Sequence, residues 1–166
     1  MGYSKKEVAE ILKKAIKGEE DGYFFYNLLS EKATAPHAKK MLENLRDDEI
    51  RHKETLIEIY TKHIGEEVGE LPEKGINVLA EVFRKGHLED RKTEMEFIEL
   101  AIEAELAATK YYQEERNLID DPAFQQIFDQ MAEEEHGHYE LLKAEREAIT
   151  GSHHWFSYDN DSPMEY

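Results

Sequence analysis

The sequence predicts an all-α fold, a four-helix bundle in which two antiparallel helix hairpins are joined by a long crossover, with an internal duplication. Hydrophobic residues make up 40% and charged residues 36% of the 166 positions, with only four prolines and nine glycines, a composition that suits long helices. Two short links flank one long connection, which is the connectivity of such a bundle. Shifting the first half by 86 residues aligns it with the second without a gap, so that Tyr26 falls on Tyr112 and Pro36 on Pro122. The duplication indicates two equivalent hairpins.

The first hairpin contains two predicted helices. One is expected over about residues 4–32, because Ser4 and the glutamate three residues later have the spacing of a capping box. The other is expected over about residues 36–64. Pro36 suits its first turn, and Gly65 is placed to end it.

The crossover is expected over residues 65–90, with a short helix at about 76–85. Four residues that disfavour a continuous helix fall in it: Gly69, Pro72, Gly75 and Gly86. The third long helix is expected over about residues 91–119, and the fourth from Pro122 to Gly151.

These elements predict one domain followed by a tail. Residues 1–150 form the bundle, with repeats at about 4–64 and 91–150, because a chain of this length can bury one substantial core. The tail, residues 151–166, contains a tryptophan and several other aromatic residues. We expect it to pack on the bundle, since it is too aromatic for a free end.

Each predicted helix carries an acidic residue where its buried face should carry an apolar one. Apolar residues recur at intervals of four and three along each helix, the spacing of a buried seam. The polar exceptions, called the six seam residues below, are Glu19, Glu49, His52, Glu105, Glu135 and His138. The interval between the two glutamates is thirty residues in both repeats, and each histidine follows a glutamate by three. The six residues are therefore expected at matching heights.

The six seam residues predict a site for two metal ions. Burying ionised carboxylates is costly unless a positive charge compensates them, and no Lys or Arg occupies the seams near them. In a Glu-x-x-His motif both side chains leave the same helix face one turn apart, so this glutamate can bridge two ions while the histidine binds one. Glu19 and Glu105 would each bind mainly one ion. Six protein ligands leave open positions for water, dioxygen or peroxide, and carboxylate-rich ligation favours iron or manganese over zinc.

Other acidic residues and histidines are expected outside the site. Four glutamates are predicted to face solvent: Glu20, Glu103, Glu133 and Glu134. His136 also follows a glutamate by three, but the repeat alignment and the apolar register favour His138.

The motifs resemble those of the ferritin-like di-iron carboxylate superfamily and, within it, the rubrerythrin-like family lacking a rubredoxin domain. The resemblance covers about residues 4–150. It rests on Glu19-x6-Tyr26, Glu49-Ile-Arg-His52, Glu105-x6-Tyr112 and Glu135-His-Gly-His138. It implies a di-iron centre, with manganese or a mixed pair as alternatives, held by the six seam residues. It also implies that Tyr26 and Tyr112 lie beside the cluster and that the chain forms dimers or larger assemblies, of which we expect a homodimer.

The chain departs from this family pattern in two respects. It has no cysteine, which excludes disulfides, thiolate zinc sites, iron–sulfur clusters and a rubredoxin-type iron centre from these residues. Rubrerythrins also tend to carry an extra glutamate one turn after the third-helix ligand. Here Ala108 occupies that position and Gly22 its counterpart, so the metal-switching behaviour linked to that glutamate is not implied.

The first functional prediction is an oxidoreductase whose di-iron centre reduces hydrogen peroxide or dioxygen with electrons from an external, rubredoxin-like donor. Tyr26 or Tyr112 would hydrogen-bond the oxygen ligand or quench stray radicals. Four alternatives stay open: a ferroxidase that handles iron, a dimanganese catalase-like enzyme, a hydroxylase acting on an organic substrate, and a metal-free structural bundle.

Charge and hydropathy limit the partners and the location. The formal net charge of −17 argues against nucleic acid or an anionic membrane as a partner, because phosphate groups attract basic patches. The first residues lack an apolar signal region, and no stretch reaches the length of a membrane span. A cytoplasmic protein is therefore expected.

Overall fold

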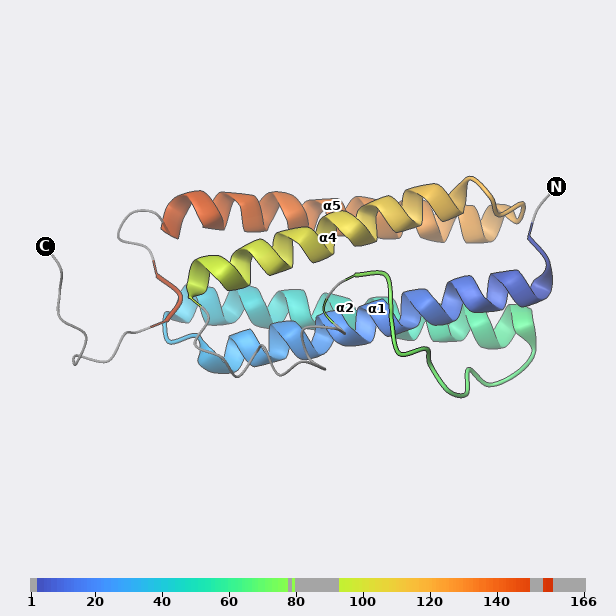
Figure 1. The fold of residues 1–166 in the computed structure, drawn as a ribbon, viewed down its shortest axis with the longest axis horizontal. Coiled ribbons are helices and arrows are strands. Elements are labelled where there is room, and N and C mark those ends of the chain that lie inside the picture. The colour runs from blue at the N-terminus through green and yellow to red at the C-terminus, as the bar shows by residue number, and fades with distance from the viewer. Residues whose placement is uncertain (1–2, 78, 80–92, 150–153, 157–166) are drawn as a thin grey trace, which may run out of the picture.

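The computed structural model describes residues 3–77, 79, 93–149 and 154–156. This part of the chain folds into four long helices and contains no β-strand (Figure 1). The helices are α1 (Lys5–Lys32), α2 (Pro36–Ile64), α4 (Glu94–Arg116) and α5 (Pro122–Ile149). None of the described helices combines the length and the apolar character needed to cross a membrane. The predicted all-α fold is confirmed.

Local interactions set the ends of α1 and α2 where the sequence predicts them. The Ser4 hydroxyl accepts the Glu7 backbone N–H at 3.2 Å, and the Glu7 carboxylate accepts the Ser4 backbone N–H at 2.6 Å, which completes a capping box. Pro36 lies in the first turn of α2. Gly65 follows the last turn with a φ of 81°, in the left-handed region that favours glycine.

Helix α4 is shorter than the predicted range of 91–119. Thr93 has an extended backbone, and its side chain accepts the Glu96 N–H at 3.2 Å, so the helix begins at Glu94. Helix α4 ends at Arg116, and Ile119 is buried in the link that follows. The predicted short helix at about 76–85 falls largely on residues 78 and 80–92, and the predicted end of the fourth helix at Gly151 also lies outside the described residues.

The four helices form two antiparallel hairpins that pack face to face. Helix α1 pairs with α2, and α4 pairs with α5. Figure 1 shows the α4–α5 hairpin above the α1–α2 hairpin, with the green segment after α2 running back across α1 toward α4. Three described residues of the crossover, Ile76, Asn77 and Leu79, thus lie beside residues of α1 and α4.

The core consists of two apolar clusters separated by a polar layer. One cluster contains Phe25, Leu42, Phe97 and Leu142, and the other contains Leu12, Leu56, Tyr112 and Phe128. On every helix the acidic seam residue lies between the part that joins one cluster and the part that joins the other. The apolar clusters therefore hold the polar layer at mid-length, away from solvent.

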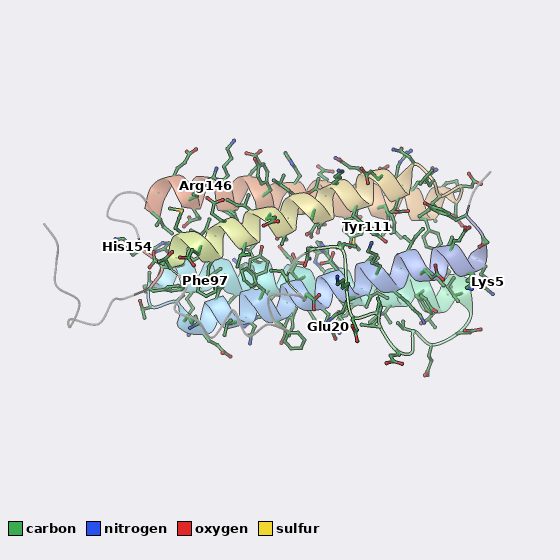
Figure 2. The ribbon with its side chains drawn as sticks, in the orientation of Figure 1. Lys5, Glu20, Phe97, Tyr111, Arg146 and His154 are labelled. Carbon is green, nitrogen blue, oxygen red and sulfur yellow. The ribbon has the colours of Figure 1, made fainter. Side chains whose placement is uncertain are left out.

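The described residues of the tail pack on one end of the bundle, as expected. Trp155 is fully buried and its indole N–H donates to Glu145 at 3.0 Å. The Trp155 carbonyl accepts the backbone N–H groups of Thr34 at 2.8 Å and Ala35 at 3.1 Å. Phe156 N–H donates to the carboxylate of Glu94 at 2.7 Å. The segment thus joins the α1–α2 turn to the start of α4, at the end of the bundle where Figure 2 labels Phe97 and His154.

Candidate metal centre

Six buried side chains meet in the polar layer, and they are the six seam residues. Each is at most 7% exposed. Helix α1 contributes Glu19, α2 contributes Glu49 and His52, α4 contributes Glu105, and α5 contributes Glu135 and His138. His136, the alternative to His138, is exposed and lies 3.5 Å from Glu140 on the surface. The structure therefore brings all six together and places His138 rather than His136 in the cluster.

The six residues form two overlapping groups, each of which could hold one metal ion. In each group, one oxygen or nitrogen atom from every residue lies within 4.8 Å of the others. The groups are Glu19, Glu49, His52 and Glu135, and Glu49, Glu105, Glu135 and His138. Glu49 and Glu135 belong to both, which is the arrangement needed for two bridging carboxylates. Their role as metal ligands stays a prediction.

Every one of the six residues has a buried polar atom without a hydrogen-bond partner among the described residues. These atoms are Glu19 Oε2, Glu49 Oε1, His52 Nδ1, Glu105 Oε2, Glu135 Oε1 and His138 Nδ1. His52 Nδ1 lies 2.8 Å from Glu135 Oε1, but this contact lacks hydrogen-bond geometry. Leaving so many buried polar atoms unpaired is costly in a folded protein. Carboxylate oxygens and imidazole nitrogens suit iron or manganese, so the donor set fits a pair of divalent ions.

Each histidine is held on its other side by a carboxylate from the opposite hairpin. His52 Nε2 contacts Glu134 Oε2, and His138 Nε2 lies 3.0 Å from Asp48 Oδ2. Such contacts fix the ring so that Nδ1 faces the centre. Arg51 Nη2 also donates to Glu134 Oε2 at 2.7 Å.

The sequence reasoning missed both of these carboxylates. Glu134 was expected to face solvent, and that expectation is wrong, because its side chain is only 28% exposed and contacts a buried histidine. A signal for the pair does exist in the sequence. Asp48 and Glu134 each directly precede a glutamate that belongs to both groups, and they are related by the same shift of 86 residues.

Tyr26 and Tyr112 lie against the cluster, each reaching across to the opposite hairpin. The Tyr26 hydroxyl donates to Glu105 Oε1 at 2.5 Å, and the Tyr112 hydroxyl donates to Glu19 Oε1 at 2.5 Å. Burial and the charge of the neighbouring carboxylates raise the pKa of both phenols well above the ordinary value. Both hydroxyls therefore stay protonated, and each leaves the second oxygen of its carboxylate free.

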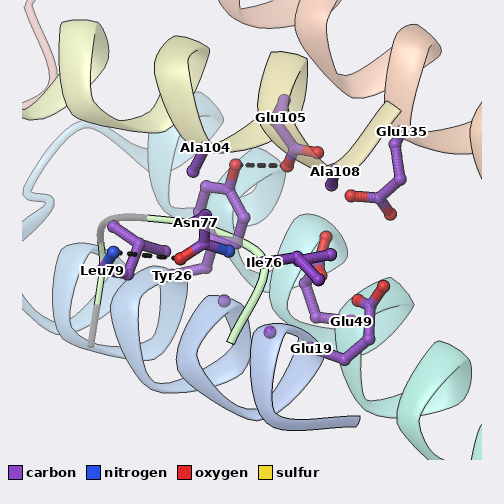
Figure 3. A pocket seen from close by; sticks show the side chains of 12 residues that line it. Glu19, Tyr26, Glu49, Ile76, Asn77, Leu79, Ala104, Glu105, Ala108 and Glu135 are labelled. Carbon is purple, nitrogen blue, oxygen red and sulfur yellow. Dashed lines mark hydrogen bonds between the residues drawn. The ribbon is translucent and has the colours of Figure 1, made fainter. Parts of the chain in front are cut away.

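A small cavity adjoins the cluster on the side between α1 and α4. Figure 3 shows the side chains around it, with the carboxylates of Glu19, Glu49, Glu105 and Glu135 on one side. Small residues, namely Gly18, Gly22, Ala104 and Ala108, and the crossover residues Ile76, Asn77 and Leu79 line the rest. Its volume is about 10 Å³, which is room for the centre of about one water-sized molecule. The cavity can therefore admit only a very small molecule next to the cluster.

The comparisons with known proteins agree with this geometry. Residues 10–146 match the family model for rubrerythrin, which is most of the chain. The chain belongs to the rubrerythrin family. No curated protein matches the sequence.

Two solved structures have the same fold as this rubrerythrin-family chain. One is a hypothetical protein from Pyrococcus furiosus, 26% identical, with a TM-score of 0.73 over 90% of this chain and 92% of that chain. The other is a two-domain protein from Anabaena variabilis that contains DJ-1/ThiJ/PfpI-like and ferritin-like domains. It is 16% identical, with a TM-score of 0.68 over 99% of this chain, which spans only 42% of that protein. The predicted ferritin-like four-helix bundle is thus confirmed.

The electrostatics of this rubrerythrin-family site favour bound cations. Burial and the neighbouring carboxylates raise the pKa of Glu49 and Glu135 well above the ordinary value. Burial lowers the pKa of His52, but the carboxylates of Glu135 and Glu19 outweigh it and raise that pKa to about 12. Without cations the cluster would therefore retain protons, shared among these residues. Because a metal ligand must be deprotonated, bound ions would replace these protons.

Gly22 leaves space beside the carboxylate of Glu49. A Cβ atom at this position would lie 2.9 Å from Glu49 Oε2. Ala108, the counterpart of Gly22, also lines the cavity. The position where the family tends to carry an extra glutamate, Ala108, and its counterpart Gly22 thus both hold small residues that line the cavity.

Proposed function

We propose that this chain is a non-haem di-iron oxidoreductase that reduces hydrogen peroxide or dioxygen with electrons from an external donor. The observation that carries this proposal is the pair of buried groups that share Glu49 and Glu135, with one unpaired donor atom on each of the six residues. Two iron ions held there would supply the redox chemistry, in which one peroxide takes up two electrons and two protons to give two waters.

The residues of the chain have distinct roles in this proposal. Glu49 and Glu135 would bridge the two ions, and Glu19 and Glu105 would each bind one. Since the six residues occupy few coordination positions for two ions, a small oxygen-containing molecule could bind as well.

The partners of the cluster residues prepare it for this role. Asp48 and Glu134 orient the two histidines from behind. The hydroxyl hydrogens of Tyr26 and Tyr112 hold Glu105 Oε1 and Glu19 Oε1, so that the other carboxylate oxygen faces the centre. The raised pKa of both phenols keeps these protons in place at neutral pH.

The size of the cavity supports peroxide or dioxygen rather than an organic substrate. Its volume of about 10 Å³ suits a molecule of a few heavy atoms, whereas pockets for larger ligands are on the order of 300 Å³ or more. The cavity favours the oxidoreductase over the hydroxylase among the alternatives.

The electron donor is proposed to be a separate, rubredoxin-like redox protein. These 166 residues include no cysteine that could ligate an iron of their own for this purpose. The net charge of −17 would attract a donor with a basic face, in a cytoplasmic setting. A homodimer is the proposed assembly.

The test is iron-dependent peroxide turnover with a matched pair of variants. Protein loaded with two ferrous ions per chain is mixed with a rubredoxin, its reductase and NADH, and the loss of NADH and peroxide is followed. We expect one NADH per peroxide for the wild type, a large loss of turnover for Glu105→Gln, and no change for the exposed Glu103→Gln on the same helix. Peroxide loss that is independent of iron, or unaffected by Glu105→Gln, would refute the proposal.

A further inference from the structure

The described residues of the crossover line one side of the cavity and contribute one polar side chain to it. Ile76, Asn77 and Leu79 line the cavity from the crossover, opposite the small residues of α1 and α4. Asn77 is the polar residue of the three, and neither the metal centre nor the core accounts for it. Figure 3 shows its side chain at the cavity, between Leu79 and Ile76.

Two glycines let the crossover backbone approach α1 closely at this point. A Cβ atom on Gly75 would lie 2.6 Å from the backbone nitrogen of Gly18. A Cβ atom on Gly18 would lie 2.5 Å from Ile76 Cγ1. Neither position has room for a side chain, so the glycines set how deeply this segment packs. The residue that follows, Asn77, is therefore held at the cavity by packing.

A hydrogen bond fixes which end of the Asn77 amide faces Leu79. The Leu79 backbone N–H donates to Asn77 Oδ1 at 2.9 Å. Because only the oxygen of the amide can accept, the NH₂ group must point the other way. Figure 3 shows the amide nitrogen on the side away from Leu79. This nitrogen forms no hydrogen bond to any residue in the described part of the chain.

Asn77 is also the donor that the cavity otherwise lacks. The other polar side chains lining it are carboxylates, which accept when ionised, and Tyr26, whose hydroxyl already donates to Glu105. The remaining lining residues are glycines, alanines and aliphatic residues. A molecule with oxygen lone pairs would meet repulsion from the carboxylates unless a donor faced it. The neutral amide of Asn77 can give that hydrogen bond without adding charge.

We propose that Asn77 is a positioning residue whose side-chain amide donates a hydrogen bond to the small oxygen-containing substrate held in the cavity. The inference rests on the proposed function, because it assumes such a substrate beside the cluster. It goes beyond that function by assigning recognition of the substrate to the crossover. Asn77 would select for ligands with an acceptor atom and orient them toward the cluster.

The test uses azide, a small ligand with acceptor atoms, on the iron-loaded protein, with its affinity measured by optical titration. Asn77→Asp keeps the shape and the acceptor for Leu79 N–H but lacks the donor. Asn77→Leu keeps the approximate shape and is neutral, but it lacks both the donor and the acceptor. We expect both variants to bind azide about 3- to 10-fold more weakly, since a hydrogen bond contributes roughly 0.5–1.5 kcal/mol. Asn117→Asp, which makes the same charge change at the C-terminal end of α4, should bind azide like the wild type.

The pattern across the variants separates the possible roles of Asn77. Weakening in Asn77→Asp alone would mean charge repulsion, and weakening in Asn77→Leu alone would mean that the amide only holds Leu79. Either pattern, or no weakening in both, overturns the proposal. Asn77→Ala replaces the leucine variant if that variant binds fewer than two irons. Azide binding needs no turnover, so failure of peroxide reduction in the wild type would refute the proposed function without affecting this result.

Discussion

At the scale of single residues, each histidine of the cluster is held from two sides. Its Nδ1 faces the carboxylates of the centre, and its Nε2 contacts an acidic residue from the opposite hairpin. This arrangement fixes the ring before any ion binds, so the acidic partner should matter for metal affinity although it does not touch the metal.

Replacing that partner should weaken metal binding. Glu134→Ala removes the carboxylate behind His52, and we expect about 10- to 100-fold lower affinity for the ion on that side. Competition with a chelator for Mn(II) or Fe(II) measures the change. The neighbouring Glu133→Ala, at an exposed position, is the matched control and should bind like the wild type. Equal affinities in the two variants would contradict the role given to Glu134.

A glycine in the site should not tolerate the methyl group of alanine. Gly22→Ala would place a Cβ atom 2.9 Å from Glu49 Oε2, so we expect displacement of that carboxylate and weaker metal binding. Gly137→Ala is the control, because a Cβ there meets nothing within 4 Å and alanine stabilises a helix by roughly 0.5–1 kcal/mol over glycine. Thermal denaturation and metal titration of both variants test this. Wild-type metal affinity in Gly22→Ala would disprove it.

At the scale of helices and links, local signals predicted some boundaries and missed others. The capping box at Ser4 and the glycine at residue 65 act within one turn of the chain, so the ends of α1 and α2 follow from sequence. The predicted start of α4 lies three residues before the observed one, although Thr93, with Glu96 three residues later, has the spacing that marks a helix start.

The candidate site also contains some residues that the sequence predicts and others that it does not. The six seam residues could be found because a glutamate at a buried register position conflicts with helical periodicity. Periodicity does not single out Asp48 and Glu134, since an acidic residue beside a buried position usually faces solvent. Asn77 lies in a crossover that has no helical periodicity in its apolar residues. Its position at the cavity depends on the close approach of Gly75 to α1, which is distant in the sequence, so sequence patterns cannot predict it.

The tail segment should contribute measurably to stability. Trp155 is fully buried between the α1–α2 turn and α4, so Trp155→Ala should lower the free energy of unfolding by about 3–5 kcal/mol. Phe24→Ala, at a side chain that is 52% exposed, should change it by less than about 0.5 kcal/mol. Chemical denaturation of both variants provides the measurement. A small effect of Trp155→Ala would mean that this end of the bundle is closed without the tail.

At the scale of the whole molecule, the duplication in sequence reappears as a duplication of contacts. Tyr26 reaches Glu105 as Tyr112 reaches Glu19, and His52 reaches Glu134 as His138 reaches Asp48. All four contacts join the two hairpins. The hairpins are therefore held together through the polar layer as well as through the apolar clusters, which links metal binding to the stability of the bundle.

This link predicts opposite effects of pH on the two forms of the protein. Without metal, Glu49, Glu135 and His52 have raised pKa values, so the folded chain binds more protons than the unfolded one. The resulting stability is fully present below the unfolded pKa values and declines as pH rises above them. The pKa of Glu134 is lowered to about 2, so the stability that this carboxylate contributes is lost only in more acidic solution.

We therefore expect the metal-free protein to lose thermal stability between about pH 6 and about pH 9. The stabilisation on adding iron or manganese should grow over the same range, because fewer protons then compete for the ligands. Melting temperatures of both forms across this range, in buffers of equal ionic strength, measure the effect. A metal-free protein that becomes more stable toward pH 9 would contradict the charge arrangement described here.

Anomalous diffraction at the iron and manganese edges, from crystals of protein purified without added metal, tests the central claim most directly. That claim is that the four helices bring their carboxylates into the interior and that two bound ions would compensate them. The result predicted is two anomalous peaks, one bound by Glu19 and His52, the other by Glu105 and His138, with Glu49 and Glu135 between them. The absence of any anomalous peak at these six residues, with their carboxyl groups paired with one another or with water instead, would contradict it.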